Sequence, residues 1–538
     1  MRNLLFAATM FLVVFVASAA KSQAQSEKMI YSFAGTPDGS NPVATVVADA
    51  KTGDIYGVTI NGGSQNRGAV FQLIPPATAT GLWTETVIYS FGPDPDGLNP
   101  NAILEDPQTG ILYGTTMFGG KNGNGTVFTL SPPSTSGAPW TESVVFSFGS
   151  QTATAPSGDF IRDNSGNFYA TTIGGGVFEL TPPSGGVGTW SANAISPFQS
   201  VFCDLNWPNV AGLVFDSSSG ILYGTAPCGG VGVLELGTFF SLTPAASSGS
   251  WTQNNLHYFQ GTNSDGAVPS GSLVDMEGVV YGTTQGGGKQ NMGTVFQIIP
   301  SLTAGGSPWI QLIHSFSGGS DGELPLGGLV AVNGALFGTT SDFSTGGTGT
   351  IFGLYAGANG SWTVADLYAF KGGATDGANP VATLTPAPNG LVNGQATLYG
   401  TTFYGGANNK GTVYAANVAV PNPGAPGFSF KAICEIICFE NSLRWRLPPP
   451  VWVVASDGIG IDSTVESVGE AGRVVVFTAR TLNGQSKFSS LSARSLTVTF
   501  SRATDFKPGQ QYRLIAKGPL VGLSPKLELL GFWKVQSH

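Results

Sequence analysis

Six aspartates recur at the same place in the sequence, each followed four residues later by a proline. They are Asp38, Asp96, Asp204, Asp265, Asp321 and Asp376. Carboxylates gathered in this way could hold Ca²⁺, accept hydrogen bonds from sugar hydroxyls, or attract a cationic group. Their regular spacing predicts a circle of carboxylates around one mouth of a closed repeat structure, and this circle is our first candidate binding site.

A local structural role is the alternative for these aspartates. In most copies a glycine follows the aspartate, and an Asp-Gly pair is ordinary turn chemistry in which the carboxylate caps its own backbone. The string Asp94-Pro95-Asp96-Gly97 has a likeness to a calcium loop, but it lacks the later glutamate and the flanking helices. Both interpretations stay open, and no cofactor other than Ca²⁺ is expected.

Other residues of interest lie in the fourth repeat and on the predicted outer strands. Trp207 falls outside the repeat pattern beside a turn, where its ring could stack on a sugar. Cys203 and Cys228 sit beside the two turns that a blade places on one face, so we predict a disulfide, with two buried thiols as the alternative. Glu85 and Glu142 occupy equivalent positions and are interpreted as solvated edge residues.

The elements that must position these residues are repeated units. The strings Tyr113-Gly114-Thr115-Thr116, Gly119-Gly120 and Gly125-Thr126-Val127-Phe128 form the best copy of a motif that recurs seven times, at about 56 residues. Each unit has four segments with strand-like alternation and no helical period. Four strands repeated seven times favour an all-β fold, a seven-bladed β-propeller, because ring closure removes long exposed sheet edges.

The two ends of the repeat array complement each other. Residues 29–33 match the end of a Trp-led strand but have no Trp before them, and the last repeat stops at Tyr414 with no Trp-led strand after it. We therefore expect the N-terminal segment to complete the blade that the last repeat leaves one strand short. Trp140, Phe148 and Phe316, which recur at repeat spacing, are expected to pack between blades.

The motif string resembles the tandem repeat known as GloVer, found in exported bacterial proteins whose C-terminal anchors vary. The resemblance covers residues 28 to about 420 and implies a repeat array and export rather than a reaction. A weaker resemblance to Kelch propellers, in which a Tyr-bearing strand ends in a Gly-Gly pair, implies that the strand of Ala102 is innermost and that of Trp83 outermost. The Asp-Gly and Gly-Gly turns then open on the same face.

Composition divides the chain into segments. Residues 1–24 have a charged start, a short apolar run and small residues, as in a secretory signal peptide. The repeats, 28–420, are acidic, residues 421–427 form a Pro- and Gly-rich linker, and residues 428–538 are basic, with strand-like runs that predict a small β-sandwich. Cys434 and Cys438 are too far apart along a regular strand to bond, so their state stays open.

Charge and hydropathy narrow the function classes. A net charge of −9 argues against nucleic acid as a partner. No stretch after the signal approaches the roughly 20 apolar residues of a membrane helix, so we expect an exported protein that is secreted, periplasmic or on the cell surface. Three functions stay open: a non-catalytic binding or scaffold module for a glycan or envelope component, an enzyme acting on a polysaccharide through carboxylates at the mouth, and a purely structural array. The sequence does not determine the oligomeric state.

Overall fold

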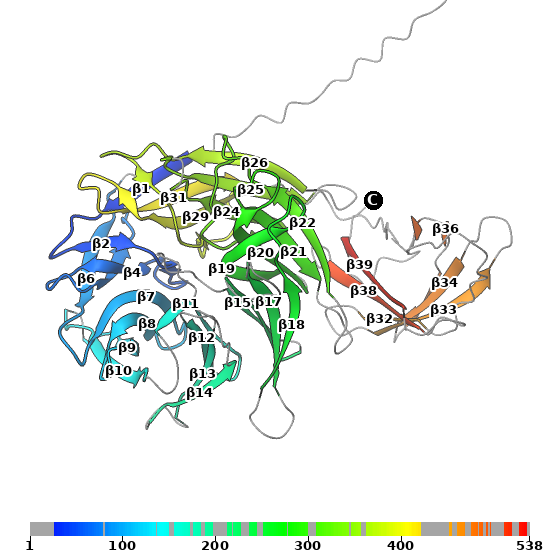
Figure 1. Ribbon diagram of the computed structural model, residues 1–538, viewed down its shortest axis with the longest axis horizontal. Helices are drawn as coiled ribbons and strands as arrows, with labels where there is room; N and C mark the ends of the chain where they lie inside the picture. The colour runs from blue at the N-terminus through cyan, green and yellow to red at the C-terminus, as the bar shows by residue number, and fades with distance from the viewer. Residues whose placement is uncertain are drawn as a thin grey trace, which may run out of the picture.

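All the described elements of the computed structural model are β-strands (Figure 1). The description covers residues 26–420 apart from gaps, and only strand residues beyond 450. The gaps are 79–80, 136, 150–154, 173–175, 184–188, 197–211, 218, 228–235, 245–250, 277, 300–307, 344–345 and 357–361. In this part of the chain no helix could span a membrane.

Six sheets follow one another along the chain and form blades 1 to 6. Blade 1 contains β2 (Gly39–Pro42), β3 (Val47–Ala48), β4 (Ile55–Gly62), β5 (Ala69–Ile74) and β6 (Thr84–Ser90). Blade 2 contains β7 (Gly97–Glu105), β8 (Leu112–Gly119), β9 (Thr126–Ser131) and β10 (Thr141–Ser147). Blade 3 contains β11 (Pro156–Arg162), β12 (Phe168–Thr172), β13 (Val177–Thr181) and β14 (Ser191–Ser196).

The second half of the ring has the same order of strands. Blade 4 contains β15 (Leu213–Asp216), β16 (Ile221–Ala226), β17 (Thr238–Pro244) and β18 (Trp251–Tyr258). Blade 5 contains β19 (Gly266–Met276), β20 (Val279–Gly287), β21 (Thr294–Ile299) and β22 (Trp309–Ser315). Blade 6 contains β23 (Val330–Val332), β24 (Ala335–Thr340), β25 (Thr350–Ala356) and β26 (Trp362–Ala369).

Blade 7 joins the two ends of the array. It contains β28 (Thr385–Pro386), β29 (Gln395–Thr402), β31 (Thr412–Ala419) and the N-terminal β1 (Ser26–Ser32), with the short pair β27 (Gly377–Ala378) and β30 (Tyr404–Gly405) beside it. Strand β1 runs antiparallel to β31, with Met29 opposite Tyr414 and Ser32 opposite Thr412. The predicted closure of the last blade by the N-terminal segment is confirmed.

The first strand of each blade touches the first strand of the next. The contacts run from β3 to β7, β11, β15, β19, β23 and β28, and from β28 back to β3. These strands therefore form the centre of a closed ring of seven blades, as the repeat count predicts. The strand that contains Ala102 is innermost, and the strand that follows Trp83 lies at the outer edge of its sheet.

The packing of the blades explains the recurring motif. A Cβ on Gly114 would lie 2.4 Å from the ring of Phe128, and on Gly282 2.5 Å from that of Phe296, so the strand must have glycine where the aromatic ring crosses it. Phe128 in turn meets Phe91 of the preceding blade, with ring centroids 5.1 Å apart. The apolar core thus lies between blades, as expected from the aromatic spacing.

Beyond residue 450 the described strands form three antiparallel sheets. One sheet contains β32 (Val451–Val454), β33 (Gly460–Val468), β34 (Val475–Thr481) and β35 (Gly484–Lys487). Two pairs follow, β36 (Leu491–Ser492) with β37 (Ser495–Leu496), and β38 (Gln511–Gly518) with β39 (Leu527–Lys534). A β-sandwich in this region stays a prediction, and Cys434 and Cys438 lie outside the described residues.

Candidate functional site

The described aspartates of the candidate ring cap the connections from one blade to the next. The Oδ2 atom of Asp96 accepts hydrogen bonds from the Tyr89 hydroxyl at 2.9 Å and the Gly92 amide at 2.6 Å, and its Oδ1 atom accepts from the Gly97 amide at 2.6 Å. Three acceptor sites of one carboxylate are therefore used inside its own loop, which is the turn-capping role.

The same cap is repeated around the ring with small changes. Asp38 accepts from the Tyr31 hydroxyl and the amides of Ala34 and Gly39. Asp376 accepts from the Tyr368 hydroxyl and the amides of Lys371 and Gly377, and Asp265 from the His257 ring and the amides of Gln260 and Gly266. The capping interpretation is confirmed at these positions, and contact with a ligand stays a prediction.

The Asp-Gly turn and the Gly-Gly turn of a blade are hydrogen-bonded to each other. The amide of Gly120 donates to the carbonyl oxygen of Asp96 at 2.7 Å, and that of Gly406 donates to Asp376 at 2.9 Å. Gly97 lies opposite Gly119 in the strand pairing. The two turns therefore open on one face of the ring, as expected, and we call this the loop face.

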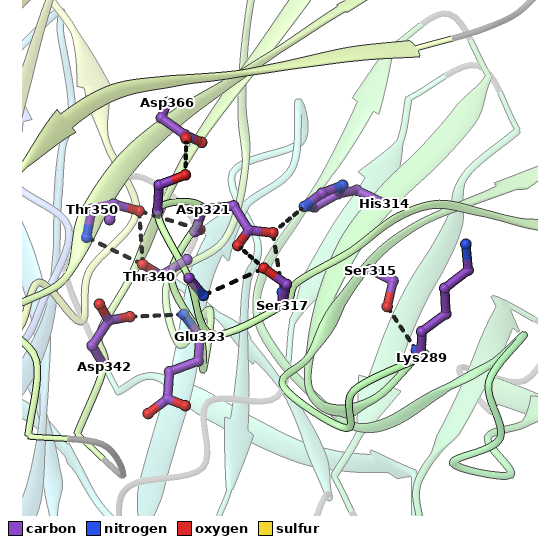
Figure 2. A network of polar contacts seen from close by, with 12 residues as sticks. Lys289, His314, Ser315, Ser317, Asp321, Glu323, Thr340, Asp342, Thr350 and Asp366 are labelled. Atoms are coloured by element: carbon purple, nitrogen blue, oxygen red, sulfur yellow. Dashed lines mark hydrogen bonds and ion pairs between the residues drawn. The ribbon is translucent and has the colours of Figure 1, made fainter.

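The aspartate at the start of blade 6 shows the most extended network. Figure 2 shows His314 and Ser317 pointing toward Asp321, whose Oδ2 atom lies 3.1 Å from the His314 ring nitrogen. The Ser317 hydroxyl donates to Asp321 Oδ1 at 2.5 Å, and Ser320 in the same turn donates to Asp366 of β26 at 2.8 Å. These bonds connect the turn to the outer strand of the next blade.

A β-bulge places the aromatic partner of each aspartate. In β6 the pairing passes from Val87 to Tyr89 while the partner strand advances by one residue, so Ile88 is the extra residue. Equivalent shifts occur before Tyr31, His257, His314 and Tyr368. Because a bulge re-aims the side chains that follow it, the aromatic residue turns toward the aspartate at the start of the next connection.

The partner of the aspartate is a tyrosine at three interfaces between blades and a histidine at two. Where it is tyrosine, the next blade contributes a glutamate: Glu85 approaches Tyr31, Glu142 approaches Tyr89, and Glu27 approaches Tyr368. Where the partner is histidine, the outer strand of the next blade has an apolar residue at the position that the glutamate occupies elsewhere. This residue is Ile310 opposite His257 and Val364 opposite His314. We call these the tyrosine interfaces and the histidine interfaces.

Glu85 and Glu142 are not the solvated edge residues that the sequence suggested, and Glu27 has the same environment. Their Oε1 atoms are buried and have no hydrogen-bond partner among the described residues. Burial, and then the nearby charge of Asp376, raises the pKa of Glu27 to about 7. Burial and the charge of Asp38 raise the pKa of Glu85 to about 7, and burial and the charge of Asp96 do the same for Glu142.

Aromatic side chains gather on the loop face of blades 6 and 7. The half-buried rings of Phe343 and Tyr404 are 6.3 Å apart between centroids, and Tyr404 lies 4.7 Å from Phe403. In blade 2 the corresponding turn carries Phe118, which is 44% exposed. Sequence analysis missed these residues, although their signal is visible, since each lies in or beside the connection that follows the Tyr-Gly or Phe-Gly strand.

The inner strands of blades 4, 5 and 6 meet through main chain. A Cβ on Gly212 would lie 2.4 Å from the oxygen of Gly271, and one on Gly271 would lie 2.4 Å from the nitrogen of Gly328. Gly271 also has a φ of 71°, which favours glycine. No side chain fits between these strands, so at these contacts the centre of the ring offers no carboxylate.

Four predicted site residues lie outside the described part of the chain: Cys203, Asp204, Trp207 and Cys228. The disulfide and the sugar-stacking role of Trp207 stay predictions. Within the described residues no group of three or more His, Cys, Asp or Glu side chains is arranged to hold a metal ion.

Comparison with known proteins identifies the repeat. Residues 14–201 and 175–414 match the family model described as the Gloeobacter/Verrucomicrobia repeat. No curated protein matches the chain. Among solved structures, the extracellular domain of a putative hybrid two-component system from B. thetaiotaomicron is 13% identical with a TM-score of 0.42, and the match covers 94% of this chain and 57% of that one.

Two further solved structures resemble the propeller. A polysaccharide lyase of the ulvan lyase family is 10% identical with a TM-score of 0.41, and 71% of this chain and 95% of that chain are covered. The propeller domain of Cps50 from Myceliophteria thermophila is 11% identical with a TM-score of 0.41, covering 73% of this chain and 100% of that one. At this similarity none of these structures assigns a substrate to the chain.

Proposed function

Because the chain belongs to the Gloeobacter/Verrucomicrobia repeat family, we propose that it is an exported, non-catalytic binding or scaffold propeller whose ligand is a glycan or another envelope component. The signal-like N-terminus and the low content of charged residues, 10%, support a role outside the cell. The basic segment after residue 420 would attach the acidic ring to a further envelope component.

The observation that carries the proposal is the group of aromatic rings on the loop face. Phe343 and Tyr404 come from neighbouring blades, are half-buried and meet edge to face beside the turns of the loop face. Sugar rings stack on aromatic faces through their C–H groups, and Tyr adds a hydroxyl. We place the ligand on this face, beside the turns of Asp38, Asp96, Asp204, Asp265, Asp321 and Asp376 and beside Trp207.

Glycan-array binding by the full chain tests the proposal. We expect specific binding without release of reducing sugar, and we expect Tyr404→Ala together with Phe343→Ala to weaken it at least tenfold, about 1.4 kcal/mol. Val392→Ala is the matched control, because Val392 is also exposed on blade 7 but lies in the connection on the opposite face. Equal loss in both variants, or no binding to any glycan or envelope extract, would count against a binding role.

The second candidate, an enzyme that cleaves a polysaccharide, is favoured by one feature. Glu85 has a pKa raised to about 7, chiefly by burial, and lies next to Tyr31, which is a usual setting for a general acid. The same arrangement occurs at three interfaces between blades, and this repetition favours a structural role. Turnover that is abolished by Glu85→Gln would establish the enzyme, whereas neither binding nor turnover would leave a purely structural array.

A further inference from the structure

Three consecutive interfaces between blades contain the same group of a tyrosine, an aspartate and a glutamate, which we call the triads. They are Tyr368, Asp376 and Glu27 between blades 6 and 7, Tyr31, Asp38 and Glu85 between blades 7 and 1, and Tyr89, Asp96 and Glu142 between blades 1 and 2. In each triad the glutamate comes from the outer strand of the following blade. The triads therefore join neighbouring blades.

Counting protons shows what one triad requires. The Tyr31 hydroxyl lies 2.9 Å from Asp38 Oδ2 and 3.4 Å from Glu85 Oε2. A phenol has one proton to donate, and Asp38 already accepts from two backbone amides, so Asp38 acts as an ionised acceptor. While the phenol proton is donated to Asp38, the contact between Tyr31 and Glu85 is a hydrogen bond when Glu85 carries a proton and donates it.

The surroundings of the glutamates favour that proton. Each buries an Oε1 atom that has no partner among the described residues, and an ionised carboxylate in this position would lose hydration without compensation. Glu27 also borders a small cavity that is lined by Ser26, Tyr368 and Asn417. The raised pKa values described above have this burial as their largest cause.

The histidine interfaces provide an internal comparison. Opposite His257 and His314 the next blade offers Ile310 and Val364 at the register position of the glutamates. At the described interfaces tyrosine occurs where the next blade brings a glutamate, and its oxygen can accept a hydrogen bond while its proton is donated to the aspartate.

We propose that the triads form a pH-dependent fastening of the propeller ring, which holds neighbouring blades together while the glutamates carry protons and loosens when they ionise. The most consequential copy involves Glu27, because it lies on β1, the strand that closes the ring. Glu27 is faced by Asp376, Tyr368, Lys371 and Tyr414. Glu85 is faced by Asp38 and Tyr31. Glu142 is faced by Asp96 and Tyr89. Lys371 is the cation among them and opposes protonation of Glu27.

Hydrogen exchange of the full chain at pH 5.5 and pH 8, corrected for intrinsic exchange rates, tests the proposal. We expect the protection of residues 26–32 to fall about tenfold as the pH rises, a change equivalent to roughly 1.4 kcal/mol. In Glu27→Gln the amide keeps the shape of the protonated acid and donates to Tyr368 without titrating, so protection should be high at both pH values.

Glu105→Gln is the matched control. Burial and the charge of Asp49 raise the pKa of Glu105 to about 7 as well, but this residue lies at the end of β7 and belongs to no triad. We expect this variant to leave the pH response of β1 unchanged. The proposal is overturned if Glu27→Gln retains the response of the unmodified chain, or if Glu105→Gln removes it equally well. Should Glu27→Gln not fold, Glu85→Gln at the interface of blades 7 and 1 answers the same question through β6.

Discussion

The tyrosine interfaces and the histidine interfaces hold the same turn with different aromatic side chains. In both, an aspartate caps its own loop and binds an aromatic side chain placed by a β-bulge. Where the next blade brings a glutamate, the aromatic side chain is tyrosine, and where it brings Ile310 or Val364, it is histidine. The comparison teaches that one turn design is adapted to whatever the neighbouring blade places against it.

The tyrosine interfaces and the interface of His314 should respond to pH in opposite directions. The folded-state pKa of the three glutamates is raised from 4.5 to about 7, so their stabilising contribution is complete below pH 4.5 and is lost as the pH rises toward 7. Burial lowers the pKa of His314 from 6.5, although Asp321 partly opposes this. Its contribution is complete above pH 6.5 and is lost as the pH falls through the folded-state pKa.

The largest expected effect comes from removing the aspartate at each kind of interface. Asp265→Ala deletes three hydrogen bonds and leaves His257 beside apolar neighbours, so we expect a loss of about 2–4 kcal/mol of stability. Asp38→Ala deletes the same number, but Glu85 can then ionise and accept from Tyr31, so the loss should be smaller. Urea unfolding at pH 7 measures both.

A second result of that experiment separates the interfaces further. Without the charge of Asp38, the pKa of Glu85 should fall toward its ordinary value, which a carboxyl ¹³C titration would detect. If both variants lose the same stability and the pKa of Glu85 does not change, the tyrosine and histidine interfaces do not differ in how they stabilise the fold.

The next largest effect is expected from converting one kind of interface into the other. Glu85→Ile alone removes the second carboxyl and leaves Tyr31 bonded to Asp38, and Tyr31→His alone places an imidazole between two carboxyls. The double variant reproduces the arrangement of His257, Asp265 and Ile310. A double-mutant cycle measured by urea unfolding should therefore give a favourable coupling of about 0.5–2 kcal/mol, and additive effects would contradict the pairing rule.

Much of this architecture could be predicted from the sequence. Seven copies of one motif, of which Tyr113-Gly114 and Gly125-Thr126-Val127-Phe128 form the best example, give the blade count, and the missing Trp before Met29 gives the ring closure, because both depend on local periodicity. The environment of Glu85 could not be read in the same way. Strand alternation places it on the face away from its own blade core, but in a propeller that face is covered by the neighbouring blade.

A smaller effect should appear at the interface between blades 5 and 6 in acid. As the pH falls below 6.5, the unfolded chain takes up a proton at His314 more readily than the folded chain, so β22 should exchange its amide hydrogens faster. His314→Tyr keeps a donor to Asp321 and removes the titration. Hydrogen exchange of residues 309–315 at pH 7.5 and pH 5 measures this, and identical acid responses in the two proteins would remove His314 from the comparison.

The smallest effect concerns Tyr414, which stands where other blades have the phenylalanines Phe71, Phe128, Phe178, Phe240, Phe296 and Phe352. Its hydroxyl is buried without a hydrogen-bond partner among the described residues, and the charge of Glu27 acts on it. Tyr414→Phe should therefore leave stability unchanged or raise it by up to about 1 kcal/mol, whereas Tyr355→Phe, which loses a bond to the carbonyl of Ala419, should cost about 1 kcal/mol. If Tyr414→Phe costs as much stability as Tyr355→Phe, the Tyr414 hydroxyl must have a hydrogen-bond partner in solution. Glu27 would then interact with two tyrosines, Tyr368 and Tyr414, beside the strand that closes the ring.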